Sequence, residues 1–428
     1  MSVQLVYGSG GSPLTGFVLE NLLKEAAGSP ERRFYVIVPE QYTLKTQKKL
    51  LNLSESRSIM NIEVLSFNRL ALRVFEELGV NRMPVLEDIG KGFVLQKMIL
   101  DNEESFGVLK NTLSRHGAAN QLKSLISELM QYRYNPPDLE AWMEDSHTGI
   151  LLTEKLEDIR LVYEAFQNYL EEKYLTAEEV PEILGKVIEE SAMMKGSTVV
   201  FDGFTGFVPT QFYVIRQLMK LCRKLTFTLT LGSGEKLFTT RGSSAFAISR
   251  KTAKTLAELA EETGTPLEKT ICTDRYSEKP DLAFLERNIF RYGSEVFDPV
   301  PEHIFLAEED NPKSEMERIA AVIRRKIRQG GRYRDFAVIT PDLKEYGLAA
   351  ADVFSREGIP YFIDEKNDIL SNILTEFCLA FFAIANENYS YSAVFRLLKT
   401  GLCSLSREET DLLETYVLAR GIRGRKNY

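Results

Sequence analysis

Apolar positions near the start of the chain form short runs separated by stretches with helical spacing. The runs are Val3–Tyr7, Phe34–Val38 and Ile62–Phe67, and each has the length and composition of a buried strand. Between the first two runs, apolar residues recur at the three- to four-residue spacing of an amphipathic helix. Strands that alternate with helices in this way predict an α/β fold built on a parallel, doubly wound sheet.

The pattern changes between about residue 84 and residue 195. In this stretch apolar residues follow the helical period, as in 122–130 and 156–170, and no convincing strand is visible. Strand-like runs return at Thr198–Phe201 and Leu225–Leu231. We therefore expect a helical insertion inside the first α/β lobe.

A second α/β unit is predicted to begin near Ile304. One face of a helix over 316–327 is apolar, and strand-like runs follow at Phe336–Thr340 and Ile359–Ile363, which together indicate a βαβ unit. From about Leu370 the pattern is helical again. The predicted division is 1–82 with 196–300 as the first lobe, 83–195 as the insertion, and 301–428 as the start of a second lobe.

Composition narrows the functional classes. The chain has 428 residues and a formal net charge of −8, so it does not bind polyanions through a generally basic surface. No apolar run approaches the roughly eighteen residues of a membrane span, and the N-terminus lacks a signal-peptide pattern, so we expect a cytoplasmic protein without a membrane partner. The cysteines and histidines are too scattered to predict a metal site, and we expect reduced thiols. These residues are Cys222, Cys272, Cys378, Cys403, His116, His147 and His303.

The turn after the first strand occupies the position of a phosphate-binding loop. A working loop reads G-x-x-x-x-G-K-[ST], where backbone N–H groups and the lysine hold phosphate and the hydroxyl holds Mg²⁺. The first glycine and the final threonine are present, whereas Pro13 and Leu14 replace the second glycine and the lysine. The alternative is a plain glycine turn between strand and helix. The matching stretch is Gly8, Ser9, Gly10, Gly11, Ser12, Pro13, Leu14 and Thr15.

An ATP-hydrolysing site of this type also needs two adjacent carboxylates at the end of another strand. The first carboxylate assists Mg²⁺ and the second directs the attacking water. Here the strand Thr198–Phe201 ends in Asp202, which is followed by Gly203. Loss of the lysine and of the second carboxylate are independent defects. Both argue against ATP hydrolysis and against use of ATP and Mg²⁺ by this chain.

Seven segments taken together resemble the N-terminal half of the AddB family, whose members are subunits of bacterial helicase–nucleases. The resemblance follows the chain nearly from end to end and in order. The segments are Val38–Gln41, Leu65–Leu70, Phe201–Phe207, Arg332–Ile339, Gly358–Asp364, Ala393–Gly401 and Gly421–Lys426.

This resemblance implies a P-loop NTPase fold of the superfamily 1 helicase type with two RecA-like lobes. It further implies a role in processing double-strand breaks for homologous recombination. An AddA-type motor and nuclease subunit and single-stranded DNA are the implied partners. The family's nuclease domain and iron–sulfur cluster belong to a C-terminal half beyond residue 428, and the abrupt end of the chain is typical of part of a longer protein. The chain departs from many members at Pro13 and Leu14, where they keep Gly-Lys.

The resemblance also places Ser66, Phe67 and Arg69 on the path of single-stranded DNA. An aromatic ring and a cation after a strand suit base stacking and phosphate contact. The alternative is a helix N-terminus with a phenylalanine in the core. The arginines on the helix 318–328 and in the tail 420–426 are interpreted as solvated or partner-facing surface.

Three hypotheses follow from these observations. The leading one is an ATPase-silent module that binds DNA and acts as a scaffold within a helicase–exonuclease subunit. The second is an active ATP-dependent DNA helicase with a non-standard loop. The third is a small-molecule kinase or another P-loop enzyme, which the long helical insertion and the second α/β unit disfavour.

Overall fold

A computed structural model gives the fold of the chain. It describes residues 1–54, 57–80, 83–113, 115, 117–145, 149–171, 173–232, 235–238, 245–274, 276–289, 291, 293, 295–364 and 369–426. Two of the three histidines, His116 and His147, lie outside these residues. The chain divides into two compact units, Met1–Phe305 and Leu306–Tyr428.

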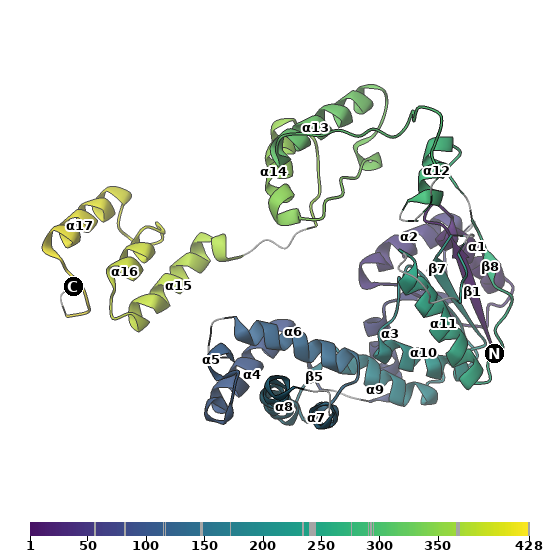
Figure 1. Cartoon of the computed structure of the whole chain (residues 1–428), viewed down its shortest axis with the longest axis horizontal. Helices are drawn as coiled ribbons and strands as arrows, with labels where there is room; N and C mark the ends of the chain where they lie inside the picture. The colour runs from purple at the N-terminus through teal and green to yellow at the C-terminus, as the bar shows by residue number, and fades with distance from the viewer. Residues whose placement is uncertain are drawn as a thin grey trace. The chain divides into compact units, whose positions relative to one another are not determined.

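The first unit is built on a six-stranded sheet (Figure 1). Across the sheet the strand order is β3–β2–β6–β7–β1–β8, and all neighbouring pairs are parallel. This confirms the predicted α/β class and the parallel sheet. The shortest strand, β8, was not predicted, because two residues carry no detectable periodicity. The strands are β1 Ser2–Gly8, β2 Phe34–Ile37, β3 Ile62–Leu65, β6 Thr198–Phe201, β7 Lys224–Thr230 and β8 Ile271–Cys272.

Helices cover both faces of this sheet. Helices α1 (Leu14–Ala27) and α2 (Thr43–Leu53) pack on one face, where Val36 and Val200 point. The other face, where Ile37 and Phe201 point, is covered by α3 (Phe67–Leu78), α9 (Glu179–Val187), α10 (Pro209–Leu221) and α11 (Ala247–Glu262). Every residue of β2 and β6 is buried, which explains why these strands read as continuous apolar runs.

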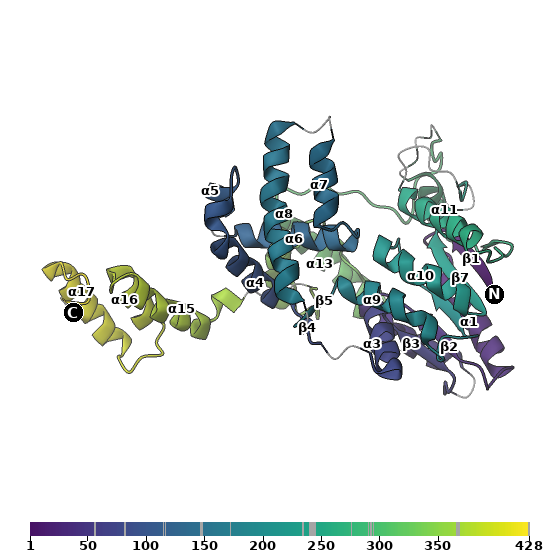
Figure 2. The same ribbon diagram turned by 90° about the horizontal axis from the view of Figure 1, so that it is seen from below.

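The predicted helical insertion has a core of its own. Its larger helices are α4 (Asp88–Asp101), α6 (Ala118–Gln131), α7 (Pro136–Glu144) and α8 (Ile150–Leu170), with the short α5 (Lys110–Leu113). Figures 1 and 2 show α7 and α8 side by side. The expectation of no strand was wrong in one detail, since Val85–Leu86 (β4) and Leu175–Thr176 (β5) form a two-stranded parallel ladder. Helix α9 packs with the sheet core rather than with the insertion.

The first unit continues through α12 (Pro280–Asn288). Its position is supported by Asp281, whose carboxylate accepts hydrogen bonds from the backbone N–H groups of Glu302 and His303 at 3.0 and 2.7 Å. The same carboxylate lies 3.0 Å from the Nδ1 atom of His303. These contacts fix the last residues of the first unit against α12.

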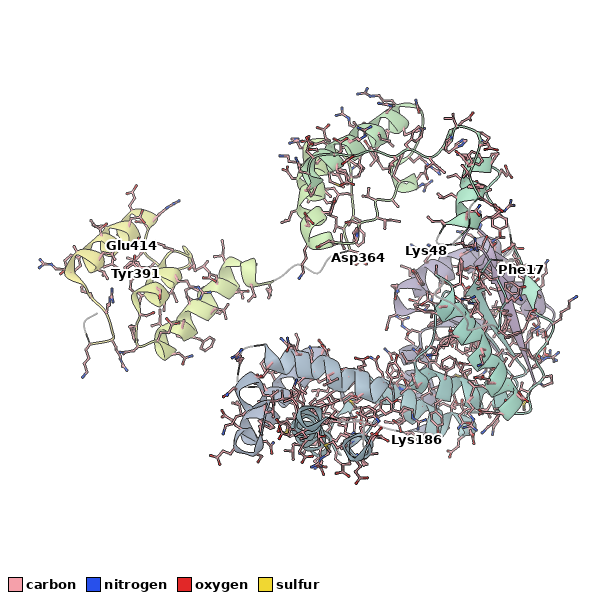
Figure 3. All side chains as sticks on the ribbon, viewed as in Figure 1. Phe17, Lys48, Lys186, Asp364, Tyr391 and Glu414 are labelled. Carbon is pink, nitrogen blue, oxygen red and sulfur yellow. The ribbon has the colours of Figure 1, made fainter. Side chains whose placement is uncertain are left out.

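The second unit is mainly helical. It contains α13 (Pro312–Arg328), α14 (Leu343–Arg356), α15 (Ile373–Asn386), α16 (Tyr391–Leu398) and α17 (Arg407–Arg420). Helices α13 and α14 share a small core around Ile323 and Val353. The hydroxyl of Tyr391 donates to the Glu414 carboxylate at 2.6 Å and joins α16 to α17 (Figure 3).

The predicted strands of this unit are not formed. Neither Phe336–Thr340 nor Ile359–Ile363 is assigned to a strand, although Phe336 has extended backbone angles. Among the described residues of this unit, Tyr333–Asp335 and Ile369–Ser371 form short 3₁₀ turns. A strand is defined by its ladder, and within residues 306–364 and 369–426 these segments have no ladder partner. The predicted βαβ unit is therefore wrong for the described part of this unit.

Candidate functional site

The candidate phosphate loop joins the carboxyl end of β1 to the first turn of α1. It is compact, because the Ser12 N–H donates to the Ser9 carbonyl at 3.0 Å and the two serine hydroxyls are 3.0 Å apart. A Cβ on Gly8 would lie 2.9 Å from the Cβ of Ser12 and 3.0 Å from the hydroxyl of Thr273. The first glycine of the loop is thus required by packing alone.

Two backbone N–H groups of the loop are hydrogen-bonded to carboxylates of the chain itself. The Ser9 N–H donates to Oδ1 of Asp274 at 2.7 Å, and the Gly11 N–H donates to Oε1 of Glu286 at 2.9 Å. Asp274 follows β8, and Glu286 belongs to α12. Backbone N–H groups of the glycine-rich loop are the groups that hold phosphate in a working phosphate loop. In this structure they hold side-chain carboxylates.

The substituted positions of the loop also have defined roles. Pro13 precedes α1 and accepts a hydrogen bond from the Phe17 N–H at 2.8 Å, although proline itself has no N–H to offer an anion. Leu14 is half-buried and packs against the core beneath α1, so the side chain that replaces the lysine is part of that core. Thr15 is half-buried in the first helical turn. A cation from outside the motif lies nearby, since Nζ of Lys49 is 3.9 Å from where a Cβ on Gly16 would be.

Asp202 lies at the same edge of the sheet as the loop, because all strands are parallel. Strand β7 separates β6 from β1, so these two strands lie about 10 Å apart, and the register places the last residue of β6, Phe201, level with Leu5, three residues before the end of β1. Helix α1, which follows β1, and helix α11, which follows β7, cover opposite faces of the sheet. In open α/β sheets, ligands bind at the carboxyl ends of two neighbouring strands that are arranged in this way. Asp202 is 4% exposed, and its Oδ1 accepts a hydrogen bond from the Thr228 hydroxyl at 2.8 Å.

Gly203 occupies the position where a water-directing carboxylate would be expected. Its φ of +78° is in the left-handed region that side chains rarely adopt. The backbone at this point is therefore shaped for glycine. A glutamate placed there would have to strain the backbone or change it.

Ser66, Phe67 and Arg69 surround the start of α3 and have three different environments. Ser66 is the N-cap, and its hydroxyl accepts from the Arg69 N–H at 3.4 Å. Phe67 is 7% exposed, and its ring lies 5.8 Å from that of Phe201 and 5.7 Å from that of Phe204. The Arg69 side chain is exposed. That Phe67 stacks on DNA bases stays a prediction, and its burial favours the alternative role in the core.

Several residues of this edge were not predicted from the sequence. Asp274, Glu286 and Lys49 lie outside any motif, and no local pattern signals that they approach the loop. Thr228 occupies a strand position at which a hydroxyl is unremarkable. Among the described residues, no group of three or more histidine, cysteine, aspartate or glutamate side chains is arranged to hold a metal ion. No described helix is long and apolar enough to cross a membrane.

The fold and this edge define an α/β protein with a doubly wound parallel sheet and a glycine-rich loop after the first strand. The family model described as "ADDB, N-terminal" matches residues 5–286. The chain belongs to this family, as the resemblance in the sequence had predicted.

Curated relatives extend this finding over the whole chain. The chain is 34% identical over 441 residues to the B subunit of the ATP-dependent helicase/deoxyribonuclease of Lachnoclostridium phytofermentans. This match covers 100% of the chain and 38% of the relative. The proteins of the same name from Caldanaerobacter subterraneus and Clostridium novyi are 34% and 32% identical, each over 100% of the chain. The chain spans 37–38% of the length of these three relatives.

Proposed function

We propose that this chain is the helicase-like, ATPase-silent part of an AddB-type subunit, and that it binds single-stranded DNA and acts as a scaffold. The relatives are named as the B subunit of a helicase/deoxyribonuclease, which supports an AddA-type partner. The proposal places the protein in the cytoplasm, in double-strand break repair by homologous recombination. An iron–sulfur cluster is proposed only for a portion outside these 428 residues.

The fold proposed for the first unit is a RecA-like lobe of the P-loop NTPase type, and 306–428 is proposed as the start of a second lobe. Support comes from the position of the glycine-rich loop after β1 and of Asp202 two strands away, at the same sheet edge. The lobe would keep the fold of a nucleotide-binding domain but would not hydrolyse ATP.

The ATPase-silent proposal rests on the hydrogen bonds and side-chain packing of the glycine-rich loop. Its Ser9 and Gly11 N–H groups are hydrogen-bonded to Asp274 and Glu286, and Leu14 packs into the core in place of a lysine. An ATP phosphate would have to displace two carboxylates and would find no lysine in the loop to stabilise developing charge.

One observation favours the alternative, an active helicase with a non-standard loop. Lys49 brings its ammonium group beside the first turn of α1 from α2, and such a group could stand in for the missing lysine. ATPase assays of the purified chain, with and without single-stranded DNA, separate the two proposals. We expect no phosphate release above background. Steady release that is lost in both Lys49→Ala and Asp202→Ala would establish the alternative.

DNA binding is tested most sharply at Arg69, because Phe67 is a core residue whose loss would destabilise the fold. We expect fluorescence anisotropy with an oligonucleotide to show weak, salt-dependent binding. Arg69→Ala should reduce the dependence of log K on log salt by about one phosphate contact. Arg73→Ala is the matched control, since Arg73 lies one turn further along α3 and is ion-paired to Glu63 at 2.7 Å. If wild type, Arg69→Ala and Arg73→Ala show the same salt dependence of DNA affinity, Arg69 is not part of the proposed DNA path.

A further inference from the structure

The two carboxylates at the phosphate loop come from residues that are distant in sequence but held in place by independent contacts. Asp274 is positioned by the sheet, because β8 pairs with β1 and the Thr273 N–H donates to the Tyr7 carbonyl at 2.9 Å. The second Asp274 oxygen, Oδ2, accepts from the Tyr276 hydroxyl at 3.2 Å. The other oxygen, Oδ1, accepts from the Ser9 N–H at 2.7 Å.

Glu286 is positioned by the end of α12. The guanidinium of Arg291 donates to the Glu286 carbonyl at 3.2 Å and is ion-paired to Glu235, also at 3.2 Å. The Glu286 carboxylate faces both glycines of the loop, since its Oε1 is 2.9 Å from the Gly11 nitrogen and 4.0 Å from where a Cβ on Gly10 would lie. A side chain larger than hydrogen at Gly10 would extend toward this oxygen.

The chemistry at these contacts is that of anion binding. The Ser9 and Gly11 N–H groups lie in the loop before α1, and a loop backbone N–H carries partial positive charge and is stabilised by a negative partner. A carboxylate bound to such a group makes a charge-assisted hydrogen bond, which is stronger than a neutral one. The loop has thus kept its preference for an anion, and anions of its own chain satisfy that preference.

We propose that Asp274 and Glu286, the carboxylate pair, are internal ligands that occupy the loop in place of phosphate and tie Asp274 and helix α12 to the β1–α1 loop. The carboxylate pair fills the loop in the absence of nucleotide, and its hydrogen bonds give the glycine-rich loop a structural role in the first unit. This inference rests on the same loop contacts as the ATPase-silent proposal and extends it, because it gives the loop a structural role whether or not the chain binds DNA.

Hydrogen exchange of the intact chain tests the pair. In wild type, the amides of Ser9 and Gly11 should exchange slowly. In Asp274→Ala/Glu286→Ala they should exchange about tenfold faster or more, since each loses a charge-assisted partner. Asp298→Ala, which removes an exposed carboxylate nearby in sequence, should leave both amides unchanged. Unchanged exchange in the double variant would overturn the proposal.

A second arm uses pyrophosphate as the probe, at ionic strength matched with chloride. It should leave the exchange of wild type unaltered and should slow the exchange of the loop in the double variant. Pyrophosphate that protects the wild-type loop equally would show that the carboxylates do not fill it. If the double variant fails to fold, the single variant Glu286→Ala gives the same test at Gly11 alone. ATP hydrolysis is measured separately, so failure of this inference is distinguishable from failure of the proposed function.

Discussion

The two units of the chain use similar apolar segments in different ways. In the first unit, β2 and β6 have neighbours on both sides, and helices cover both faces of the sheet, so every residue of these strands is buried. In the second unit, the segments 336–340 and 359–363 form no strand, and Ile339 and Phe362 are 94% and 88% exposed. These segments line an open apolar pocket of about 770 Å³.

This difference shows that an apolar run specifies a strand only when the fold supplies partners for its backbone. Backbone N–H and C=O groups must be paired when they are buried, and only a neighbouring strand pairs them regularly along a sheet. The sequence signal for a strand was similar in both units. The presence of neighbouring strands decided the outcome.

The largest contrast is expected in the reactivity of the cysteine thiols. Burial raises the pKa of the Cys222 thiol in the first unit to about 12, whereas Cys378 in the second unit is exposed. The reactive species is the thiolate, so alkylation of Cys222 at pH 8 should be about a thousandfold slower than that of an ordinary exposed thiol. Mass spectrometry after iodoacetamide treatment measures both rates. Comparable rates at Cys222 and Cys378 would contradict the buried position of Cys222.

Removing one phenylalanine from each unit should give unequal losses of stability. Phe201 is fully buried and stacked on Phe227 with ring centroids 4.8 Å apart, so Phe201→Ala should cost about 3–5 kcal/mol. Phe362→Ala should change stability by less than about 0.5 kcal/mol, because the ring is exposed. Urea unfolding followed by circular dichroism compares the variants. A large loss in Phe362→Ala would mean that this segment is packed in solution.

Glycines with positive φ allow the same substitution to be compared in both units. Gly203 has a φ of +78° and Gly358 a φ of +64°, so a glutamate at either position should cost about 1–2 kcal/mol. Only Gly203→Glu places a carboxylate next to Asp202. We expect equal destabilisation of the two variants by urea unfolding and no ATP hydrolysis from either. Hydrolysis by Gly203→Glu alone would show that the missing carboxylate was the main defect of the loop site.

The smallest effects are expected at two helix N-caps. Ser66→Ala removes the cap of α3, and Ser406→Ala removes the hydroxyl that accepts from the Glu409 N–H at the start of α17, each at a cost of about 1 kcal/mol at neutral pH. Hydrogen bonds from the Ser406 backbone and hydroxyl lower the pKa of Glu409 below its ordinary 4.5. The contribution of that carboxylate is therefore present above pH 4.5 and is lost as the pH falls through the lowered value. Thermal unfolding of wild type and Glu409→Ala over a pH series measures it, and a difference in stability that does not shrink in acid would exclude this role of Glu409.

The sequence by itself determined the local features of this protein. The alternation of strands and helices predicted the parallel sheet, and the helical period predicted the insertion. Residue identity alone predicted that Leu14 and Gly203 stand where an active P-loop site would have a lysine and a carboxylate. These features depend on periodicity and on side-chain chemistry, which are properties of neighbouring positions and can be read without the fold.

Only the tertiary structure decided which groups meet. The ring of Phe67 has the same chemistry in a core as in a DNA path, and its contacts with Phe201 and Phe204 place it in the core. The carboxylates at the candidate phosphate loop lie more than 260 residues in sequence from the N–H groups that donate to them. The unpaired segments of the second unit likewise have the apolar composition of strands. Strand pairing and anion binding depend on contacts between residues far apart in sequence. A local sequence pattern does not identify the partner residue of such a contact.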